Sequence, residues 1–365
     1  MIGLLAIASY ASSAYRLSSA SPVLWIRQGL QSSYTASLPN VTIFATGGTI
    51  AGESTSSTLN SGYDVAASMQ ELVDAVPEML QYANVGGFQV SEVGSTNMNQ
   101  TILLELHKAV SAEVLKSNVS GVVLTHGSDT LEETCFFLYL TVDTEKPIVC
   151  TAAMRPSTAV SADGPANVLQ SVVRATAPNA RNRGAMVSLN DKITSAVFAT
   201  KNHANNPDTF YSTDAGALGY YLDSIPYFYF EAAKPIGTRY FDISDPYALP
   251  QIDILYSHQD MNPGLPNASV ALGAKGLVFA GNGDGGVADL AYYAAESIHN
   301  AKGISVVTSH KVPNGWANTD GFVIGSAHLN HVKARILLQL AVYEGLDDEE
   351  VGALFDALRP NPWLI

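Results

Sequence analysis

The sequence has little cysteine, little positive charge and no long apolar run. Its two cysteines, Cys135 and Cys150, are too few for a disulfide framework and are expected to be buried free thiols. The 365 residues carry 19 Lys and Arg against 33 Asp and Glu, a net charge of −14, which argues against the basic surface that nucleic-acid binding needs. No apolar stretch is long enough to span a bilayer. We therefore expect neither nucleic acid nor a membrane as a partner.

Signals for a metal or a nucleotide are also weak. The only closely spaced histidines, His328 and His331, lack a third candidate ligand nearby and are expected to cap a surface helix. The glycines at Gly47, Gly48 and Gly52 do not have the dinucleotide-binding spacing, and no lysine follows them as in a phosphate-binding loop. A nucleotide-binding enzyme is left as a distant alternative, and we expect no metal or cofactor.

Short apolar runs alternate with helix-period segments along the chain, which is long enough for two domains with buried cores. Buried strands are predicted at residues 41–45, 121–124, 147–151 and 185–189, and helices at residues 67–76, 101–115 and 131–142. This alternation predicts βαβ units, and hence an α/β fold with helices on both faces of a mainly parallel sheet.

The same alternation restarts after an aromatic, proline-punctuated stretch at residues 209–250. Strands are predicted there at residues 252–256, 276–280 and 304–308, and helices at residues 288–300 and 331–344. We therefore predict a larger N-terminal α/β domain at residues 38–227, a linker at 228–249, and a smaller C-terminal α/β domain with a parallel sheet at 250–365.

Residues 1–37 are rich in Ser, Ala and Tyr and begin with an apolar run, as a secretory signal and linker would. Glycosylation sequons begin at Asn40, Asn99, Asn118 and Asn267, which favours a secreted, cell-wall or periplasm-like glycoprotein. Because no Lys or Arg precedes the apolar run, a Ser-rich tail on a cytoplasmic protein stays open as the alternative.

Two glycine-flanked hydroxyl motifs each follow a predicted strand. The first, Ala-Thr-Gly-Gly-Thr-Ile-Ala-Gly at residues 45–52, carries Thr49, and the second, Thr-His-Gly-Ser-Asp-Thr at residues 125–130, carries Ser128 and Asp129. Carboxyl ends of parallel strands meet at one edge of a sheet, so both hydroxyls are expected to converge on one small substrate. The pair suggests an enzyme that attacks a carbonyl with an activated hydroxyl.

The second motif is also predicted to start a helix. Thr130 and Glu133 have the spacing of a capping box, which places Ser128 and Asp129 at the positive end of the helix. That end favours a carboxylate or an oxyanion, although Asp129 could instead only support the helix start. His126 is expected to be a hydrogen-bonded structural histidine.

With supporting stretches at residues 94–99, 153–157 and 161–165, these motifs resemble those of the bacterial-type (type II) L-asparaginases of the asparaginase/glutaminase family. The match runs from about Leu38 to the C-terminal helices. It implies a flavodoxin-like N-terminal sheet, hydrolysis of L-asparagine to L-aspartate and ammonia, and a homotetramer with sites at subunit interfaces. A glutaminase-asparaginase that also takes L-glutamine, and a catalytically impaired amino-acid-binding relative, stay open as alternatives.

The resemblance also implies roles for single residues. Thr49 matches the nucleophile, Tyr63 the lid tyrosine that helps activate it, and Lys201 the catalytic lysine, with Ser128 and Asp129 completing the catalytic set. The positions that match substrate-binding residues are Ser95, Thr96, Ser128, Asp129 and Ala153. Since an unactivated threonine is a poor nucleophile, Lys201 must give up a proton to act as its base. Backbone N–H groups around Ser128 and Ala153 are the expected oxyanion donors.

The chain departs from the family pattern at three places. Ser128 stands where a threonine is expected, and Thr96 stands where a glutamine or glutamate is usual. The loop at residues 316–320 is shorter, so the acidic residue that reaches a neighbouring subunit's site has only Asp320 as a candidate, with Asp284 as another C-terminal loop acid. These departures leave the preference between asparagine and glutamine open.

Overall fold

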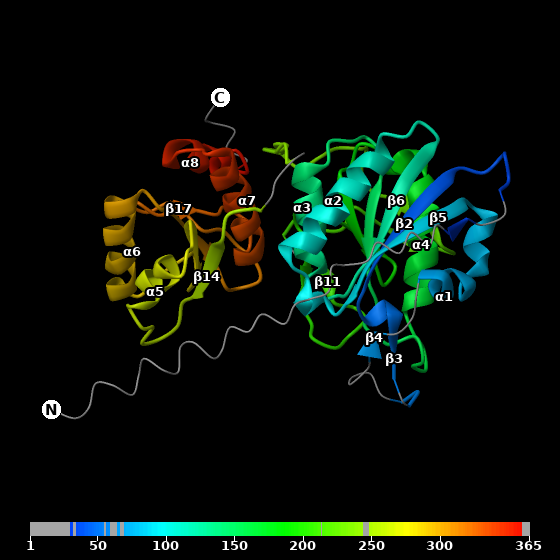
Figure 1. The fold of residues 1–365 in the computed structure, drawn as a ribbon, viewed down its shortest axis with the longest axis horizontal. Coiled ribbons are helices and arrows are strands. Elements are labelled where there is room, and N and C mark those ends of the chain that lie inside the picture. The colour runs from blue at the N-terminus through cyan, green and yellow to red at the C-terminus, as the bar shows by residue number, and fades with distance from the viewer. Residues whose placement is uncertain are drawn as a thin grey trace.

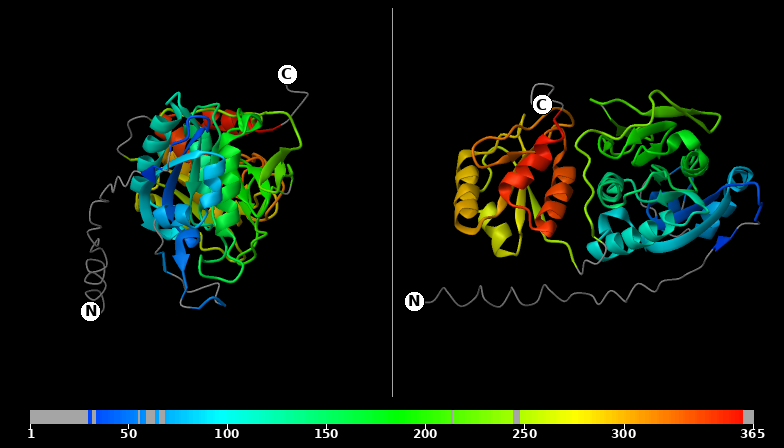
Figure 2. Two further views of the ribbon diagram at one scale, coloured as in Figure 1. Left: turned by 90° about the vertical axis from the view of Figure 1, so that its right-hand side faces the viewer. Right: turned by 90° about the horizontal axis from the view of Figure 1, so that it is seen from above.

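The chain forms a large sheet with helices on both faces, followed by a smaller sheet with helices of its own (Figures 1 and 2). The structure is a computed structural model that describes residues 30–31, 34–54, 56–58, 64–65, 69–212, 214–243 and 248–359. Most of the expected signal segment, residues 1–37, lies outside these residues. Within them, no helix is both long and apolar enough to cross a membrane.

The large sheet has nine strands in the order β1-β5-β2-β6-β7-β8-β9-β12-β13. Neighbours from β5 to β8 run parallel, and the other pairings are antiparallel. Taken along the chain, the parallel strands have the spatial order 2-1-3-4-5, which confirms the flavodoxin-like arrangement. The strands are β1 Leu30–Gln31, β2 Asn40–Gly47, β5 Asn84–Val93, β6 Val119–Thr125, β7 Ile148–Thr151, β8 Ala185–Leu189, β9 Lys192–Ser195, β12 Gly219–Leu222 and β13 Ile225–Phe228.

All four buried strands predicted in this part are confirmed, as β2, β6, β7 and β8, but β5 was not expected. Its apolar pattern is interrupted by Gly86 and Gly87. A Cβ at Gly87 would lie 2.3 Å from the sulfur of Met69 and 2.7 Å from the carbonyl oxygen of Ile43. The close approach of the first helix to the sheet therefore requires a glycine here, which hides the strand from a pattern search.

Helices α2 and α3 cover one face of this sheet, and α1 and α4 cover the other (Figure 1). Phe44 belongs to the core under α2 and α3, whereas its neighbour Ile43 belongs to the core under α1 and α4, because successive strand residues face opposite sides. Cys135 and Cys150 are buried free thiols, as expected. The helices are α1 Met69–Asp74, α2 Gln100–Val114, α3 Leu131–Thr141 and α4 Gly164–Thr176, of which the first three were predicted.

The small sheet is parallel throughout, in the order β14-β15-β16-β17, which confirms the predicted second α/β unit. Helix α6 packs on one face, and α7 on the other, where it also contacts α3. Phe136 and Leu140 of α3 line one small cavity together with Leu337 of α7, and all three belong to one core cluster, so the two units have a common apolar interface. The elements are β14 Ile252–Tyr256, β15 Gly276–Gly281, β16 Ser305–His310, β17 Ile324–Gly325, α5 Leu265–Ala271, α6 Asp289–Lys302, α7 His331–Glu344 and α8 Asp348–Asp356.

Replacing Leu140 by alanine is expected to lower the free energy of unfolding by about 2–5 kcal/mol, because the cavity forms in the core shared by α3 and α7. Leu272, which is 88% exposed, is the matched control, and its alanine variant should stay within about 0.5 kcal/mol of the parent. Urea denaturation followed by circular dichroism measures both. Equal small losses in the two variants would contradict the shared core.

Candidate active site

The carboxyl ends of β2, β5, β6 and β7 form one edge of the large sheet, and the loops beyond them carry most of the predicted site residues. Ala45 of β2 pairs with Thr125 of β6, and Thr125 pairs with Thr151 of β7, so these strands end side by side. The chain leaves β2 towards β5 on one side and leaves β6 towards β7 on the other. Open α/β sheets bind ligands in the crevice at such a switch point.

The two glycine motifs touch each other at this crevice. Gly48 has a φ of 84°, and a Cβ built on it would lie 2.2 Å from the Cα of Gly127. A Cβ on Gly127 would in turn lie 2.7 Å from the side-chain oxygen of Ser95. The loops after β2, β5 and β6 can approach this closely only because positions 48 and 127 are glycines. The contact therefore brings Thr49, which is buried in a short 3-10 helix at residues 49–51, close to Ser128.

Lys201 joins the second motif through its ammonium group. It lies on β10 (Thr200–Lys201), a short strand paired with β11 (Phe210–Tyr211). The Lys201 Nζ donates to Ser128 Oγ at 2.9 Å and to Asp129 Oδ1 at 2.6 Å. Ser128 is buried, whereas the Asp129 side chain is 59% exposed and faces the solvent side of the site. The Lys201 ammonium thus lies within hydrogen-bond distance of both a buried hydroxyl and an accessible carboxylate.

Ser95 lies beside the start of α3, in the loop after β5. Its hydroxyl accepts a hydrogen bond from the Asp129 N–H at 3.2 Å, and its carbonyl oxygen accepts one from the Thr130 hydroxyl at 2.8 Å. Helix α3 does begin after Thr130, as predicted, but the capping box is wrong, because the Glu133 N–H donates to the Thr130 carbonyl oxygen at 3.1 Å and not to the hydroxyl. Glu133 instead pairs with Arg335, and burial raises the pKa of its carboxyl group.

The other predicted site residues differ in their burial and position. Ala153 is fully buried after β7, in a turn whose next two N–H groups donate to the Asp163 carboxylate at 2.9–3.1 Å. Thr96 follows Ser95 on the same short 3-10 helix and is exposed. Tyr63 lies outside the described residues. The structure therefore groups Thr49, Ser95, Ser128, Asp129 and Lys201 at the carboxyl edge of the sheet, with Ala153 in the loop after the adjacent strand.

A buried network next to the site was not expected from the sequence. Glu132, in the first turn of α3, accepts from Lys333 Nζ at 3.1 Å, from Asn330 Nδ2 at 2.9 Å and from the backbone N–H of Lys201 at 3.4 Å. Lys333 is 201 positions away along the chain. No local motif signals such a pairing, because it depends on how α7 packs against α3.

Two histidines, His126 and His328, have their pKa values lowered by burial. His126 is fully buried, lies 2.7 Å from the Gly127 carbonyl oxygen, and burial lowers its pKa to about 4, so it is neutral at physiological pH. Burial, with the charge of Lys333, also lowers the pKa of His328 to about 4. His328 packs against Phe198 rather than capping a surface helix, so that expectation is wrong for this residue.

Among the described residues, no group of His, Cys, Asp and Glu side chains is arranged to hold a metal.

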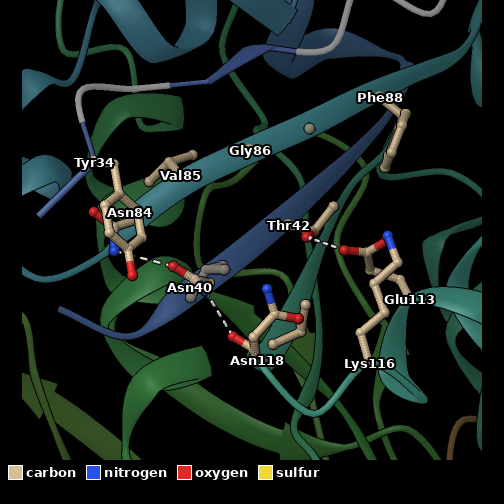
Figure 3. A pocket seen from close by; sticks show the side chains of 13 residues that line it. Tyr34, Asn40, Thr42, Asn84, Val85, Gly86, Phe88, Glu113, Lys116 and Asn118 are labelled. Carbon is tan, nitrogen blue, oxygen red and sulfur yellow. Dashed lines mark hydrogen bonds and ion pairs between the residues drawn. The ribbon is translucent and has the colours of Figure 1, made fainter. Parts of the chain in front are cut away.

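Cavities also occur among the described residues away from this edge. A groove of about 560 Å³ opens at the amino ends of β2 and β5, the opposite end of the sheet. There the Asn40 side chain donates to the Asn118 carbonyl oxygen and accepts from Asn84, and the Thr42 hydroxyl donates to Glu113 (Figure 3). A cavity of about 520 Å³ in the small-sheet unit is lined by both Asp284 and Asp320. It lies at the carboxyl ends of β15 and β16, the ligand-binding edge of a parallel sheet.

Comparison with known proteins agrees with this geometry. Residues 40–233 match the family described as asparaginase, N-terminal, and residues 251–355 match the glutaminase/asparaginase C-terminal domain. The chain is 41% identical to L-asparaginase 2-3 of Saccharomyces cerevisiae, covering 94% of this chain and 95% of that protein. It is 38% identical to a probable periplasmic L-asparaginase of Haemophilus influenzae, covering 90% and 95%. The crystal structure of a probable cytoplasmic L-asparaginase from Campylobacter jejuni superposes with a TM-score of 0.83 at 36% identity, covering 87% and 99%. The chain therefore belongs to the asparaginase family.

Proposed function

We propose that this chain is an L-asparagine amidohydrolase, which converts L-asparagine and water to L-aspartate and ammonia. The observation that carries the proposal is the contact of one lysine, Lys201, with both the Ser128 hydroxyl and the Asp129 carboxylate, beside the loop of Thr49. This arrangement combines a proton acceptor, a nucleophile and an anchor for a cationic substrate group in a chain of the asparaginase family.

The substrate is proposed to bind by its α-amino-acid groups. The accessible Asp129 carboxylate suits the α-ammonium, and the Ser95 hydroxyl and the N-terminus of α3 suit the α-carboxylate. Lys201 Nζ donates a hydrogen bond to Asp129 Oδ1 at 2.6 Å. An incoming ammonium competes for this carboxylate, which releases Lys201 to interact with Ser128 alone. Binding of the correct substrate thus prepares the base.

The reaction is proposed to run through a threonine acyl-enzyme. Lys201 first loses one ammonium proton to solvent, so that its amine can act as a base. Thr49 Oγ then attacks the side-chain amide carbon while its proton passes by way of Ser128 to this amine, with Tyr63 of the lid assisting. Backbone N–H groups around Ser128 and Ala153 stabilise the oxyanion. The C–N bond then breaks, and the proton goes to the leaving ammonia. Water hydrolyses the ester to release L-aspartate and free Thr49; no step in this scheme calls for a metal or cofactor.

A low-discrimination glutaminase-asparaginase is the second candidate. Thr96 is short and exposed where the family usually has a longer amide or acid, so the pocket there is less able to exclude an extra methylene. A relative that binds amino acids without turnover is the third candidate, since Ser128 lacks the methyl group that fixes the orientation of a threonine.

We further infer the setting in which the enzyme works. The proposed domains are residues 38–227 and 250–365, joined by a linker at 228–249. In the proposed homotetramer, sites lie at subunit interfaces, and Asp284 or Asp320 of one subunit completes the site of another. Residues 1–37 are proposed as a secretory signal and linker, and the sequons support a secreted or cell-wall glycoprotein.

Thr49→Ala is expected to lower kcat for ammonia release from L-asparagine by at least about 10⁴-fold, because no other hydroxyl replaces the nucleophile. Calorimetric binding of L-aspartate should persist, since Ser95 and Asp129 are unchanged, and this binding is the control for folding. Activity of the variant near that of the parent would reject Thr49 as nucleophile.

Ser128→Ala is expected to lower kcat by roughly 10²–10³-fold, because it removes the hydroxyl between Lys201 and the nucleophile. Ser128→Thr, which restores the usual family residue, should keep kcat at the parent value or above it. Steady-state ammonia release measures both. A fully active alanine variant would show that the hydroxyl carries no proton.

The ratio of kcat/KM for L-asparagine to that for L-glutamine separates the three candidates. One additional methylene typically changes this parameter by about 10–200-fold, and we expect asparagine to be preferred within this range. A ratio near one identifies the low-discrimination enzyme. Absence of turnover on both amides, with L-aspartate still bound, identifies the impaired relative.

A further inference from the structure

A buried ion pair joins α7 to α3 directly behind the site. Of the salt bridges between described residues, the pair of Lys333 and Glu132 is the only one with both side chains at least nine-tenths buried, at 1% and 10% exposure. Lys333 Nζ lies 3.1 Å from Glu132 Oε2 and also donates to the carbonyl oxygen of Ala199 at 2.5 Å. The lysine therefore ties the segment before Lys201 to the first turn of α3.

The glutamate completes this link from the other side. Glu132 Oε1 accepts the backbone N–H of Lys201 at 3.4 Å, while Oε2 also accepts from Asn330 at 2.9 Å. Asn330 in addition caps the N-terminus of α7 and donates to the Thr200 hydroxyl at 3.2 Å. Residues 199–201 are thus held at three successive positions by groups from α3 and α7.

We propose that Lys333 and Glu132 are positioning residues for Lys201, and that α7 thereby sets the place of the proton acceptor. Neither side chain is assigned a contact with the substrate. Their effect passes through β10, the strand of Thr200 and Lys201, from which the Lys201 side chain reaches Ser128 and Asp129. This inference rests on the proposed function, in which Lys201 takes the proton of the nucleophile.

A role in stability alone does not account for this pair. Breaking a buried ion pair is costly, but a packed apolar pair of the same volume would stabilise the interface as well or better. The adjacent pair of Glu133 and Arg335 already joins the same two helices, at 3.0 Å and with about a quarter of each side chain exposed. Lys333 and Glu132 add directed hydrogen bonds to the backbone of the segment that carries Lys201: one to the Ala199 carbonyl oxygen and one from the Lys201 N–H.

The test compares Lys333→Met with Arg335→Met, since each removes one ion pair between α3 and α7. Lys333→Met is expected to lower kcat for asparagine by about 10–100-fold, the loss typical of a reacting group displaced by about 1 Å. KM should change by less than about threefold, because Ser95 and Asp129 stay in place. Arg335→Met should keep kcat within about twofold of the parent. Equal kcat values in the two variants would overturn the proposal.

A double variant keeps the test decisive if Lys333→Met folds poorly. Lys333→Met with Glu132→Gln leaves no unpaired buried charge but still lacks the donor to Ala199, so kcat should stay at least about tenfold below that of the pair Arg335→Met with Glu133→Gln. Recovery of the parent kcat would reject positioning by the ion pair.

A crystal structure of the double variant gives a readout that does not depend on turnover. The Lys201 Nζ is expected to move beyond hydrogen-bond distance of Ser128 Oγ, from the present 2.9 Å. If the parent releases no ammonia from asparagine and Lys201 nevertheless moves, the proposed function fails and the positioning role holds. An unmoved Lys201 refutes the positioning role whatever the parent does.

Discussion

The backbone contact between Gly48 and Gly127 is the constraint on which the candidate site depends. The strands before these residues, β2 and β6, are hydrogen-bonded neighbours, so their following loops start about one strand spacing apart. A side chain on either glycine would collide with the opposite backbone or with Ser95. The glycines therefore bring the backbone at Thr49 near the backbone at Ser128, the residues that follow them. Glycine beside each hydroxyl residue is what allows the two loops to touch.

The sequence predicted those elements whose buried residues are apolar and follow a regular pattern. Strands buried on both faces, such as β6, are continuous apolar runs, and the flavodoxin-like order followed from the family resemblance. Helix α4 was missed because its buried side includes Asn167, Gln170 and Arg174, which break the apolar stripe. Thr130 was placed correctly at the start of α3 but bonds to a distant loop rather than to its own helix. Spacing alone does not reveal that a distant loop accepts a hydrogen bond from this hydroxyl.

The same limit applies at the site. Local motifs mark Thr49, Ser128 and Asp129, because glycine next to a hydroxyl residue at a strand end indicates a ligand-binding loop within a few positions of sequence. Glu132 and Lys333 have none: in sequence they are an acidic residue in a first turn and a lysine on an amphipathic helix, both typical of exposed surfaces. Their burial follows from the packing of α7 on α3, which juxtaposes residues 201 positions apart.

This packing explains why charged groups rather than apolar ones surround the segment that carries Lys201. A strand of two residues with one partner of equal length has too few ladder hydrogen bonds to define its own position. Apolar contacts are non-directional and would leave its backbone free to slide. Hydrogen bonds from Lys333 and Asn330, and one to Glu132, act on the Ala199 carbonyl, the Thr200 hydroxyl and the Lys201 N–H, each with a required direction. The polar network at the interface thus supplies the orientation that the short strand lacks, and the position of Lys201 at the candidate site depends on a helix that packs against the other sheet.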